Sequence, residues 1–269
     1  WYIVRFDKDA DLKEAVRQLR KLGEISKIQS NPTLQRAYDP KKKTLYLSAS
    51  DLQHVTRTSE GLTFNDPGLK HQWHYRNAGN YDFVKKDRAE AIAGADVNCG
   101  EAWELCKGDP SIIVAVLDEG VMWSHPDLIA NMWTNEAEEI GSTEDKDGNG
   151  YKGDRYGYNF VKNTGVISWT SADDTGHGTH VAGIIAAVNN NGEGVSGIAG
   201  GDGTPNSGVK LMSCQVFDGE GGVTLDGEAK AIKYAADNGA VILQCSWGYN
   251  SGDANLVDGY TPGPATQKE

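Results

Sequence analysis

The sequence predicts an α/β protein whose parallel sheet carries helices on both faces, preceded by a small α+β domain. Short apolar runs, which are typical of strands buried on both faces, alternate with longer segments of helical periodicity. They lie at residues 111–117, 177–188, 209–217, 225–238 and 240–246. Because strands that alternate with helices are joined by crossovers, we expect the strands to run parallel.

The N-terminal domain is expected to span residues 1–63 and to follow a β-α-β-β order. Asp11, with Glu14 three residues later, forms a capping-box pattern, and an apolar stripe at helical spacing follows it up to Gly23. Residues 56–64 are polar and without periodicity, which is typical of a linker. Three strand-like runs complete the domain, at residues 1–6, 24–38 and 43–48.

The larger domain is expected to span residues 64–269 and to contain two helices that cover the sheet. The helix at 177–188 has four apolar residues at helical spacing, which are expected to face the core: Val181, Ile184, Ile185 and Val188. For the helix at 225–238, Asp226 is the expected N-cap and Gly239 the expected glycine after the last turn.

Composition restricts the classes of partner. The 269 residues carry 26 basic and 38 acidic side chains, a net charge of -12, which disfavours binding to nucleic acid or to an anionic membrane surface. No stretch approaches the roughly 20 apolar residues that a membrane-spanning helix needs. Of the four cysteines, Cys214 and Cys245 lie in apolar runs and are expected to be buried free thiols.

Two segments carry residues suited to hydrolytic chemistry. Asp118 follows an apolar run, so it is expected at the C-terminal end of a buried strand. His177 stands between glycines at the start of a helical pattern, which places the imidazole on a rigid element. Taken alone, such an aspartate is more often a turn former or a helix cap. Together, and in this order, the two residues predict two members of an Asp-His-Ser triad.

These segments resemble those of the subtilisin-like serine peptidases, the subtilases. Asp118 and Gly120, with the His-Pro-Asp-Leu run at 125–128, resemble the catalytic aspartate segment of that family, and residues 177–183 resemble its histidine motif. The resemblance implies a subtilisin-like parallel sheet. It also implies a serine endopeptidase in which His177 is the general base and Asp118 holds its ring in the correct tautomer.

The resemblance extends to two segments that bind substrate in the family. Ser246, Trp247 and Gly248 resemble the wall of the pocket for the substrate residue before the scissile bond. Gly219 and Gly221 belong to a glycine-rich run that is similar to the edge that pairs with an extended peptide. The implied partners are therefore polypeptide substrates.

The sequence departs from the family pattern in two ways. Glu119 follows the aspartate where the family usually has a small or hydroxyl-bearing residue, which places a second negative charge near the histidine. No Gly-Thr-Ser-like nucleophile segment follows His177, and none of the later serines has that context: Ser196, Ser207, Ser213, Ser246 and Ser251. We therefore expect an incomplete catalytic domain that is inactive as given. The alternative is a noncatalytic pseudopeptidase that binds peptides or acts as an inhibitor.

Two groups of oxygen-bearing side chains are candidate calcium ligands. One group alternates along a polar, glycine-containing loop, like the opening of a calcium loop: Asp145, Asp147, Asn149 and Asp154. Tyr156 stands where such a loop has its bidentate glutamate, and a metal-free polar turn is the alternative. The second group is implied by the subtilase resemblance: Asp66, Asp127 and Asn190. Structural calcium is therefore the expected cofactor.

Residues 1 to about 55 resemble a subtilase propeptide. The resemblance implies that this unit assists folding of the catalytic domain and that its C-terminal tail lies along the substrate groove as an intramolecular inhibitor. Maturation would then leave a protein that starts near Phe64, and a permanent accessory domain is the alternative. The implied location is secreted or within the cell envelope. The expected signal peptide is absent from this chain, which opens on Trp1.

Overall fold

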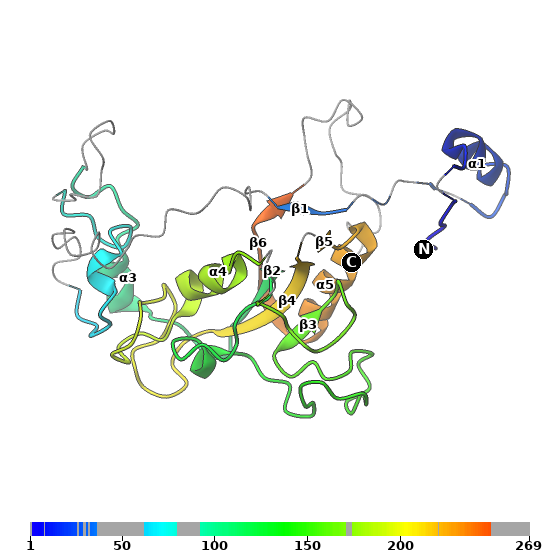
Figure 1. The fold of residues 1–269 in the computed structure, drawn as a ribbon. Coiled ribbons are helices and arrows are strands. Elements are labelled where there is room, and N and C mark those ends of the chain that lie inside the picture. The colour runs from blue at the N-terminus through cyan, green and yellow to red at the C-terminus, as the bar shows by residue number, and fades with distance from the viewer. Residues whose placement is uncertain are drawn as a thin grey trace.

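A parallel sheet forms the centre of the protein (Figure 1). The computed structural model describes residues 2–7, 9–25, 27–28, 31, 33–36, 62–79, 92–170, 174–219 and 221–248. The parallel strands of the sheet are β2 (Ile113–Glu119), β3 (Gly157–Asn159), β4 (Lys210–Asp218) and β6 (Ala240–Cys245). They run in the order β3-β4-β2-β6, and all three neighbouring pairs are parallel. The predicted parallel sheet is therefore confirmed.

Two helices cover opposite faces of this sheet, α4 (His177–Ala186) and α5 (Leu225–Asp237). Consecutive residues of a strand point to opposite faces. Accordingly, Leu117 of β2 packs in the cluster that contains Tyr234 of α5, whereas Val116 packs in the cluster that contains Ala182 of α4. Each face of the sheet therefore has its own hydrophobic core, as a doubly covered sheet requires.

A third, smaller core lies outside the sheet. It is built around the short helices η1 (Leu69–His71) and α3 (Cys99–Leu105), and its buried members are Leu69, Tyr75, Cys99 and Trp103. A further short helix, η2 (Ile129–Asn131), follows β2. Cys214 is buried as expected, whereas Cys245 is exposed, because β6 is the last strand on its side of the described sheet. None of the helices in the described ranges is long and apolar enough to cross a membrane.

The helix expected in the N-terminal segment is present as α1 (Leu12–Leu19). Asp11 caps it as predicted, because its Oδ1 accepts hydrogen bonds from the backbone N–H groups of Lys13 and Glu14 at 2.9 and 3.1 Å. The helix ends earlier than predicted, since its C-cap is Arg20 rather than a residue next to Gly23. None of its residues is buried.

Of the three strands predicted for the N-terminal segment, the described residues form only a short part of one. Residues 2–7 are not a strand, and no strand among the described residues pairs with them. Their apolar side chains are exposed: Tyr2, Ile3, Val4 and Phe6. Within the run 24–38, the described strand is limited to β1 (Gln35–Arg36). The predicted strand at 43–48 lies outside the described residues, and the division of the chain near residue 63 stays a prediction.

The buried face of α4 follows the prediction in part, because Val181 and Ile185 are partly buried against the core as predicted. Gly178, Ala182 and Ala186, spaced by four residues, are fully buried, whereas Ile184 is 38% exposed. The reason is the close approach of helix and sheet. A Cβ atom on Gly178 would lie 2.2 Å from the carbonyl oxygen of Glu119, so only small side chains fit between them.

One end of α5 follows the prediction and the other does not. Its N-cap is Thr224, and Asp226 lies inside the first turn, where its carboxylate accepts from the Thr224 hydroxyl at 2.5 Å. Asp226 was therefore the wrong residue for the cap, although an acidic side chain in the first turn still suits the helix dipole. Gly239 follows the last turn as predicted, with the left-handed φ of +86° that favours glycine.

Candidate active site

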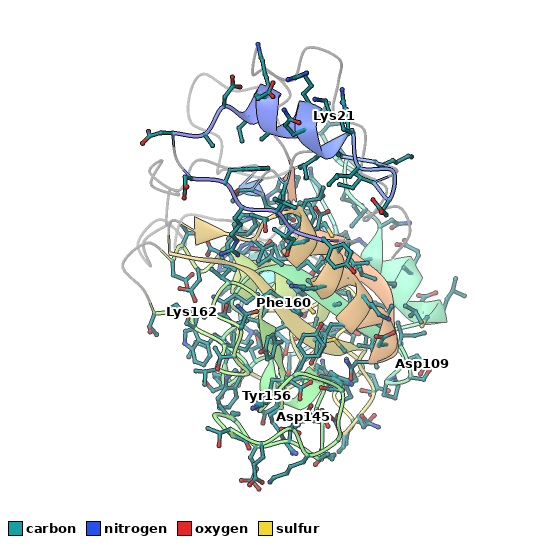
Figure 2. All side chains as sticks on the ribbon, turned by 90° about the vertical axis from the view of Figure 1, so that its right-hand side faces the viewer. Lys21, Asp109, Asp145, Tyr156, Phe160 and Lys162 are labelled. Atoms are coloured by element: carbon teal, nitrogen blue, oxygen red, sulfur yellow. The ribbon has the colours of Figure 1, made fainter. Side chains whose placement is uncertain are left out.

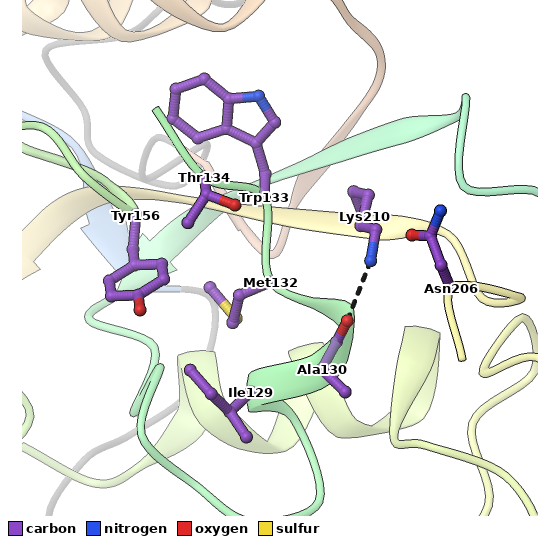
Figure 3. A pocket seen from close by; sticks show the side chains of 8 residues that line it. All are labelled: Ile129, Ala130, Met132, Trp133, Thr134, Tyr156, Asn206 and Lys210. Carbon is purple, nitrogen blue, oxygen red and sulfur yellow. Dashed lines mark hydrogen bonds between the residues drawn. The ribbon is translucent and has the colours of Figure 1, made fainter. Parts of the chain in front are cut away.

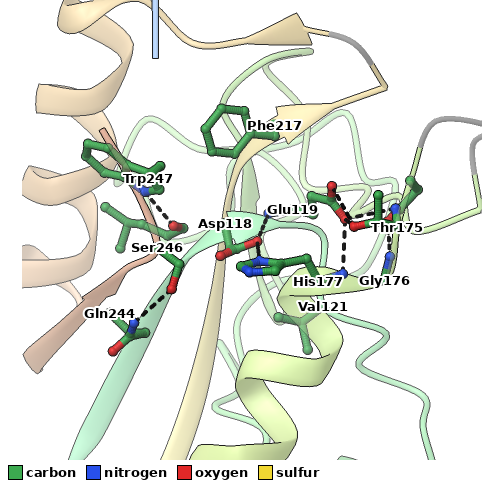
Figure 4. A network of polar contacts seen from close by, with 12 residues as sticks. Asp118, Glu119, Val121, Thr175, Gly176, His177, Phe217, Gln244, Ser246 and Trp247 are labelled. Atoms are coloured by element: carbon green, nitrogen blue, oxygen red, sulfur yellow. Dashed lines mark hydrogen bonds and ion pairs between the residues drawn. The ribbon is translucent and has the colours of Figure 1, made fainter. Parts of the chain in front are cut away.

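The structure brings Asp118 and His177 together although 59 positions separate them in the chain. Asp118 lies at the C-terminal end of β2, and His177 is the first residue of α4 (Figure 4). His177 Nδ1 lies 2.7 Å from Asp118 Oδ1. The Asp118 side chain is 2% exposed, whereas that of His177 is 26% exposed. The imidazole is therefore bound to a buried carboxylate and still reaches solvent.

Among the described residues, the Asp118 carboxylate has hydrogen-bond partners at one of its two oxygens. Its Oδ1 accepts a second hydrogen bond, from the backbone N–H of Glu119 at 2.7 Å. Its Oδ2 is buried and has no hydrogen-bond partner among the described residues. Because a carboxylate is an acceptor when it is ionised, this contact favours the histidine tautomer that carries its proton on Nδ1.

Glu119 also lies at this site, where its carboxylate binds backbone N–H groups at the start of α4. It is 1% exposed, and its Oε2 accepts from the backbone N–H of His177 at 3.2 Å and from that of Thr175 at 3.1 Å. The Thr175 hydroxyl donates to both carboxylate oxygens, at 3.2 and 3.1 Å. The second negative charge expected from the sequence therefore lies at the start of α4.

The serines that follow His177 have other partners where they are described. Ser196 is fully buried, and its hydroxyl donates to Asp66 at 2.5 Å. Ser213 is also fully buried and accepts from the backbone N–H of Val121. Ser207 donates to a carbonyl of its own loop at 2.8 Å. Ser251 lies outside the described residues.

One predicted substrate-binding wall is a strand that is paired with the N-terminal segment. Trp247 and Gly248 form β7 (Trp247–Gly248), which pairs antiparallel with β1. Gly248 lies opposite Gln35 in that pairing. The indole N–H of Trp247 donates to the Leu117 carbonyl at 2.7 Å, and Ser246 Oγ accepts from the Gln244 amide at 3.1 Å.

The second predicted wall lies on the other side of the same segment. Gly221 belongs to β5 (Gly221–Gly222), which pairs antiparallel with β4, and Gly219 lies in the turn between them. The backbone N–H of Leu34 donates to the Val223 carbonyl at 2.8 Å, and Thr33 forms an antiparallel bridge with Thr224. Residues 33–36 therefore run between the two walls as an extended strand.

Leu34 anchors this strand in the core. It is 3% exposed and belongs to the cluster that contains Phe217 and Val223, and Trp247 packs against that cluster. The resemblance to a propeptide predicts that a C-terminal tail lies in the groove, from the part of the segment before Phe64. Residues 37–61, where that tail is predicted, lie outside the described residues, and the described segment between the walls is residues 33–36.

The acidic loop before β3 holds the first group of candidate metal ligands, at the end of the molecule away from α1 (Figure 2). Ligand atoms of Glu138, Asp145 and Asp147 lie within 4.8 Å of one another. Glu138 is 1% exposed and accepts from the backbone N–H groups of Lys146 and Gly153 at 2.5 and 2.8 Å. Sequence reasoning missed Glu138, because it lies seven residues before the motif and no spacing pattern connects it to Asp145.

The other predicted members of this group, the exposed Asn149 and the buried Asp154, are connected to it by hydrogen bonds. Asn149 donates to both Asp147 and Asp154, at 3.1 and 3.0 Å. Asp154 is fully buried, and its Oδ2 also accepts from the Tyr234 hydroxyl at 2.8 Å. Burial raises the pKa of Asp154. The loop therefore concentrates carboxylates, including two buried ones, at one place.

The second group of candidate ligands surrounds the loop that follows α4. Asp66 accepts from the backbone N–H groups of Asn190 and Asn191 at 2.9 and 3.0 Å. Asp127 accepts from the Asn191 side chain at 2.8 Å and from the N–H of Val195 at 2.9 Å. Burial raises the pKa of Asp127, and the charge of Asp66 adds to this. Thus the Asn191 side chain contacts Asp127, whereas the Asn190 side-chain oxygen accepts from the backbone of Asn65.

A separate pocket of about 410 Å³ lies beside η2 (Figure 3). Met132, Trp133 and Tyr156 are among its lining residues, and none of the predicted site residues is. Lys210 extends along the pocket and donates to the Ala130 carbonyl at 2.9 Å, and burial lowers the pKa of its amine.

Comparisons with known proteins agree with this geometry. A sequence model of the subtilase family matches residues 109–268, more than half of the chain. The chain is 30% identical over 241 residues to subtilisin-like protease 1 of Plasmodium berghei (strain Anka), an alignment that covers 89% of this chain and 35% of that protein. It is 35% identical over 159 residues to a halolysin-like extracellular serine protease of Natrialba magadii, covering 59% of this chain and 25% of that protein.

A solved structure supports the fold alone. The serine protease of Aeromonas sobria, solved in complex with a chaperone, has a TM-score of 0.51 and 24% sequence identity, with coverage of 77% of this chain and 29% of that chain. The chain thus spans about a third or less of the length of these relatives. The sequence match over residues 109–268 nevertheless includes both Asp118 and His177. The chain therefore belongs to the subtilase family of serine peptidases.

Proposed function

We propose that this chain provides the acid and the base of a serine endopeptidase active site. The observation that carries the proposal is the 2.7 Å contact between His177 Nδ1 and Asp118 Oδ1 at the end of a buried parallel strand. This contact leaves Nε2 as the acceptor of the ring, because Nδ1 carries the proton. The ring can then take a proton from a serine hydroxyl at Nε2.

The proposed reaction is acyl transfer from a peptide bond. As the serine oxygen bonds to the substrate carbonyl carbon, His177 takes the hydroxyl proton. His177 then gives that proton to the leaving amine as the carbon–nitrogen bond breaks. Asp118 keeps the ring in the required tautomer and stabilises the imidazolium between these steps. Because none of the serines after His177 has a nucleophile context, we propose that the serine comes from a segment that the given sequence does not contain, and the chain as given is expected to be inactive.

Labelling with a fluorophosphonate tests this proposal. In protein that contains the serine segment, the probe is expected to modify one serine, and His177→Ala is expected to abolish the modification. Bound peptide without any labelling would favour the noncatalytic alternative, a pseudopeptidase. A serine that is labelled equally with and without His177 would contradict the proposed role of the histidine.

We further propose that residues 33–36 act as a substrate-like inhibitory segment. The segment is extended, pairs with β7, and hydrogen bonds to the Val223 carbonyl beyond β5. Strand addition of this kind uses backbone hydrogen bonds for affinity and buried side chains for specificity. The buried Leu34 would then occupy the place of a substrate side chain, so polypeptides with a large aliphatic residue are the proposed substrates.

Leu34→Asp is expected to release this segment from the groove. Burial of a leucine is worth about 1.5–3 kcal/mol, so amide hydrogen exchange of residues 33–36 should accelerate at least 10- to 100-fold. Leu12→Asp, the same substitution at a residue of α1 that is 58% exposed, is the control and should leave this exchange unchanged. Equal exchange in both variants would exclude Leu34 as the anchor.

Calcium is the proposed structural cofactor, and the loop around Glu138 is its best-supported site. The buried Glu138 carboxylate contacts backbone N–H groups, and the nearby Lys146 amine binds Glu139 instead. Several carboxylate oxygens within reach of one another form the donor set that Ca²⁺ prefers. Bound calcium would hold the loop by neutralising Glu138, Asp145 and Asp147.

Calcium is expected to raise the thermal unfolding midpoint. At a calcium concentration 100 times the Kd, the stabilisation should be about 2.7 kcal/mol. Asp147→Asn removes one charge and should weaken calcium binding about tenfold. The control is Glu136→Gln, because Glu136 is an exposed neighbour that pairs with Arg155. Titration calorimetry measures the calcium affinity of the unmodified chain and of each variant. If the unmodified chain binds calcium no more tightly than Asp147→Asn does, the proposed site is wrong.

The proposed location is outside the cytoplasm. One relative is named as an extracellular protease, that of Natrialba magadii. The formal charge of -12 also favours a soluble, well-dispersed protein. Detection of the protein in the culture medium would support this location, and recovery from the cytoplasm alone would contradict it.

A further inference from the structure

We propose that Glu119 is a positioning residue, which holds the backbone of His177 while Asp118 holds its ring. This inference rests on the proposed function, because it assigns a role in aligning the proposed general base. Glu119 and Asp118 are neighbours at the end of β2. Together they would fix the imidazole at two points, one in the side chain and one in the main chain (Figure 4).

The start of α4 needs a cap from elsewhere in the chain. The first N–H groups of a helix have no partner within the helix, and a side chain at the N-cap usually accepts from one of them. The N-cap of α4 is Gly176, which has no side chain and adopts a left-handed φ of +72°. The helix therefore cannot cap itself in the usual way.

Glu119 supplies the missing acceptor from the neighbouring strand. Its Oε2 lies 3.2 Å from the backbone N of His177, the first residue of the helix. The same oxygen accepts from the backbone N–H of Thr175, and the Thr175 hydroxyl donates to the carboxylate as well. The carboxylate thus binds the residues on both sides of Gly176.

The backbone of Glu119 strengthens the connection between strand and helix. Its N–H donates to Asp118 Oδ1 at 2.7 Å, the oxygen that also binds the imidazole. Its carbonyl oxygen lies against Gly178, where a Cβ atom would approach to 2.2 Å. Glu119 therefore contacts the carboxylate partner of the ring, the N–H of His177, and the next residue of the helix.

The buried position of the Glu119 carboxylate requires hydrogen-bond donors around it. A carboxylate that is 1% exposed loses its hydration, which is costly unless donors replace the water. Two backbone N–H groups and a hydroxyl provide those donors, and the N-terminus of a helix carries a partial positive charge. A residue that only filled space would need neither the charge nor these donors.

Hydrogen exchange and histidine NMR on the chain itself test the proposal. Glu119→Leu keeps roughly the size of the side chain but removes both acceptor oxygens, so the backbone N–H groups of His177 and Thr175 lose their partner. The amide of His177 should then exchange about 5- to 30-fold faster, the factor expected for a lost helix cap. In Glu119→Ala the acceleration should be larger, and the Nδ1–H resonance of the His177 ring should broaden or disappear.

The control is Asp202→Asn. Asp202 accepts from the backbone N–H and the hydroxyl of Thr204, as Glu119 does with Thr175, but it lies in an exposed loop. This variant should leave the exchange of His177 and its ring resonance unchanged. If Glu119→Leu also leaves both unchanged, Glu119 only fills space and the inference is wrong.

The experiment also separates this inference from the proposed function. A His177 Nδ1–H resonance that is absent from the unmodified chain would show that the Asp118–His177 pair itself does not form. If the resonance is present in the unmodified chain but the Glu119 variants do not alter it, the Asp118–His177 pair is supported and the positioning role of Glu119 is wrong.

Discussion

Asp118→Asn is expected to lower kcat about 10⁴-fold in protein that carries the nucleophilic serine. The asparagine amide has nearly the same shape as the carboxylate, so the fold should be retained. The amide, however, removes the charge that stabilises the imidazolium and can donate to Nδ1, which favours the wrong tautomer. KM should change little, because Asp118 is buried beneath the ring and contacts substrate only through His177.

Steady-state kinetics on a peptide substrate measures this effect. Asp109→Asn is the control, because Asp109 is an aspartate near the start of β2 whose carboxylate binds only Ser111 in its own turn. It should keep the unmodified kcat. A kcat for Asp118→Asn within tenfold of the unmodified protein would contradict the role assigned to the pair.

Gly178→Ala is expected to destabilise the protein by about 3 kcal/mol, the upper range for overpacking of a tight core. The new Cβ atom would lie 2.2 Å from the Glu119 carbonyl oxygen, which belongs to the central strand and cannot easily move. The helix would have to shift away from β2 and carry His177 with it. Loss of the Asp118–His177 contact should therefore accompany the loss of stability.

Gly183→Ala provides a matched control in the same helix. A Cβ atom on Gly183 has nothing within 4 Å, so the substitution should stabilise the helix by about 0.5–1 kcal/mol. Urea unfolding of both variants measures the difference. Two alanine variants of equal stability would mean that helix and strand do not approach as closely as the structure indicates.

The sheet and its two covering helices could be predicted because each depends on a local pattern. Apolar runs of strand length specify β2 and β4, and the alternation with helices specifies the parallel order. Asp118 and His177 could be found for a related reason, since each lies at the end of a patterned element. The subtilase resemblance then supplied the pairing that the patterns alone do not contain.

Packing across the sheet could not be predicted in the same way. Helical periodicity correctly placed Val181 and Ile185 against the core but also selected Ile184, which is exposed. The close approach of α4 to β2 buries small residues most deeply: Gly178, Ala182 and Ala186. The contact of Glu119 with the first N–H of α4 is likewise a tertiary feature, because no local sequence pattern records the distance between strand and helix. Such contacts depend on the distance and orientation between the helix and the strand, which a local sequence pattern does not specify.

The acidic loop and the N-terminal segment illustrate the same limit. Glu138 joins Asp145 and Asp147 through the path of a loop, which has no periodicity to read. Residues 2–7 have the composition of a strand, yet they are not a strand, because a strand also needs a partner. Residues 35–36 form one because β7 lies beside them.

The protonation of the His177 ring tests the central claim most directly. Nitrogen-15 NMR of the chain near neutral pH, with ¹⁵N-labelled histidine, distinguishes a protonated Nδ1 from a protonated Nε2. The account predicts a proton on Nδ1 that is held by Asp118, a free Nε2, and loss of this preference in Asp118→Asn. A proton on Nε2 in both the unmodified chain and Asp118→Asn would contradict the account, because the imidazole could not then accept a proton from serine at Nε2.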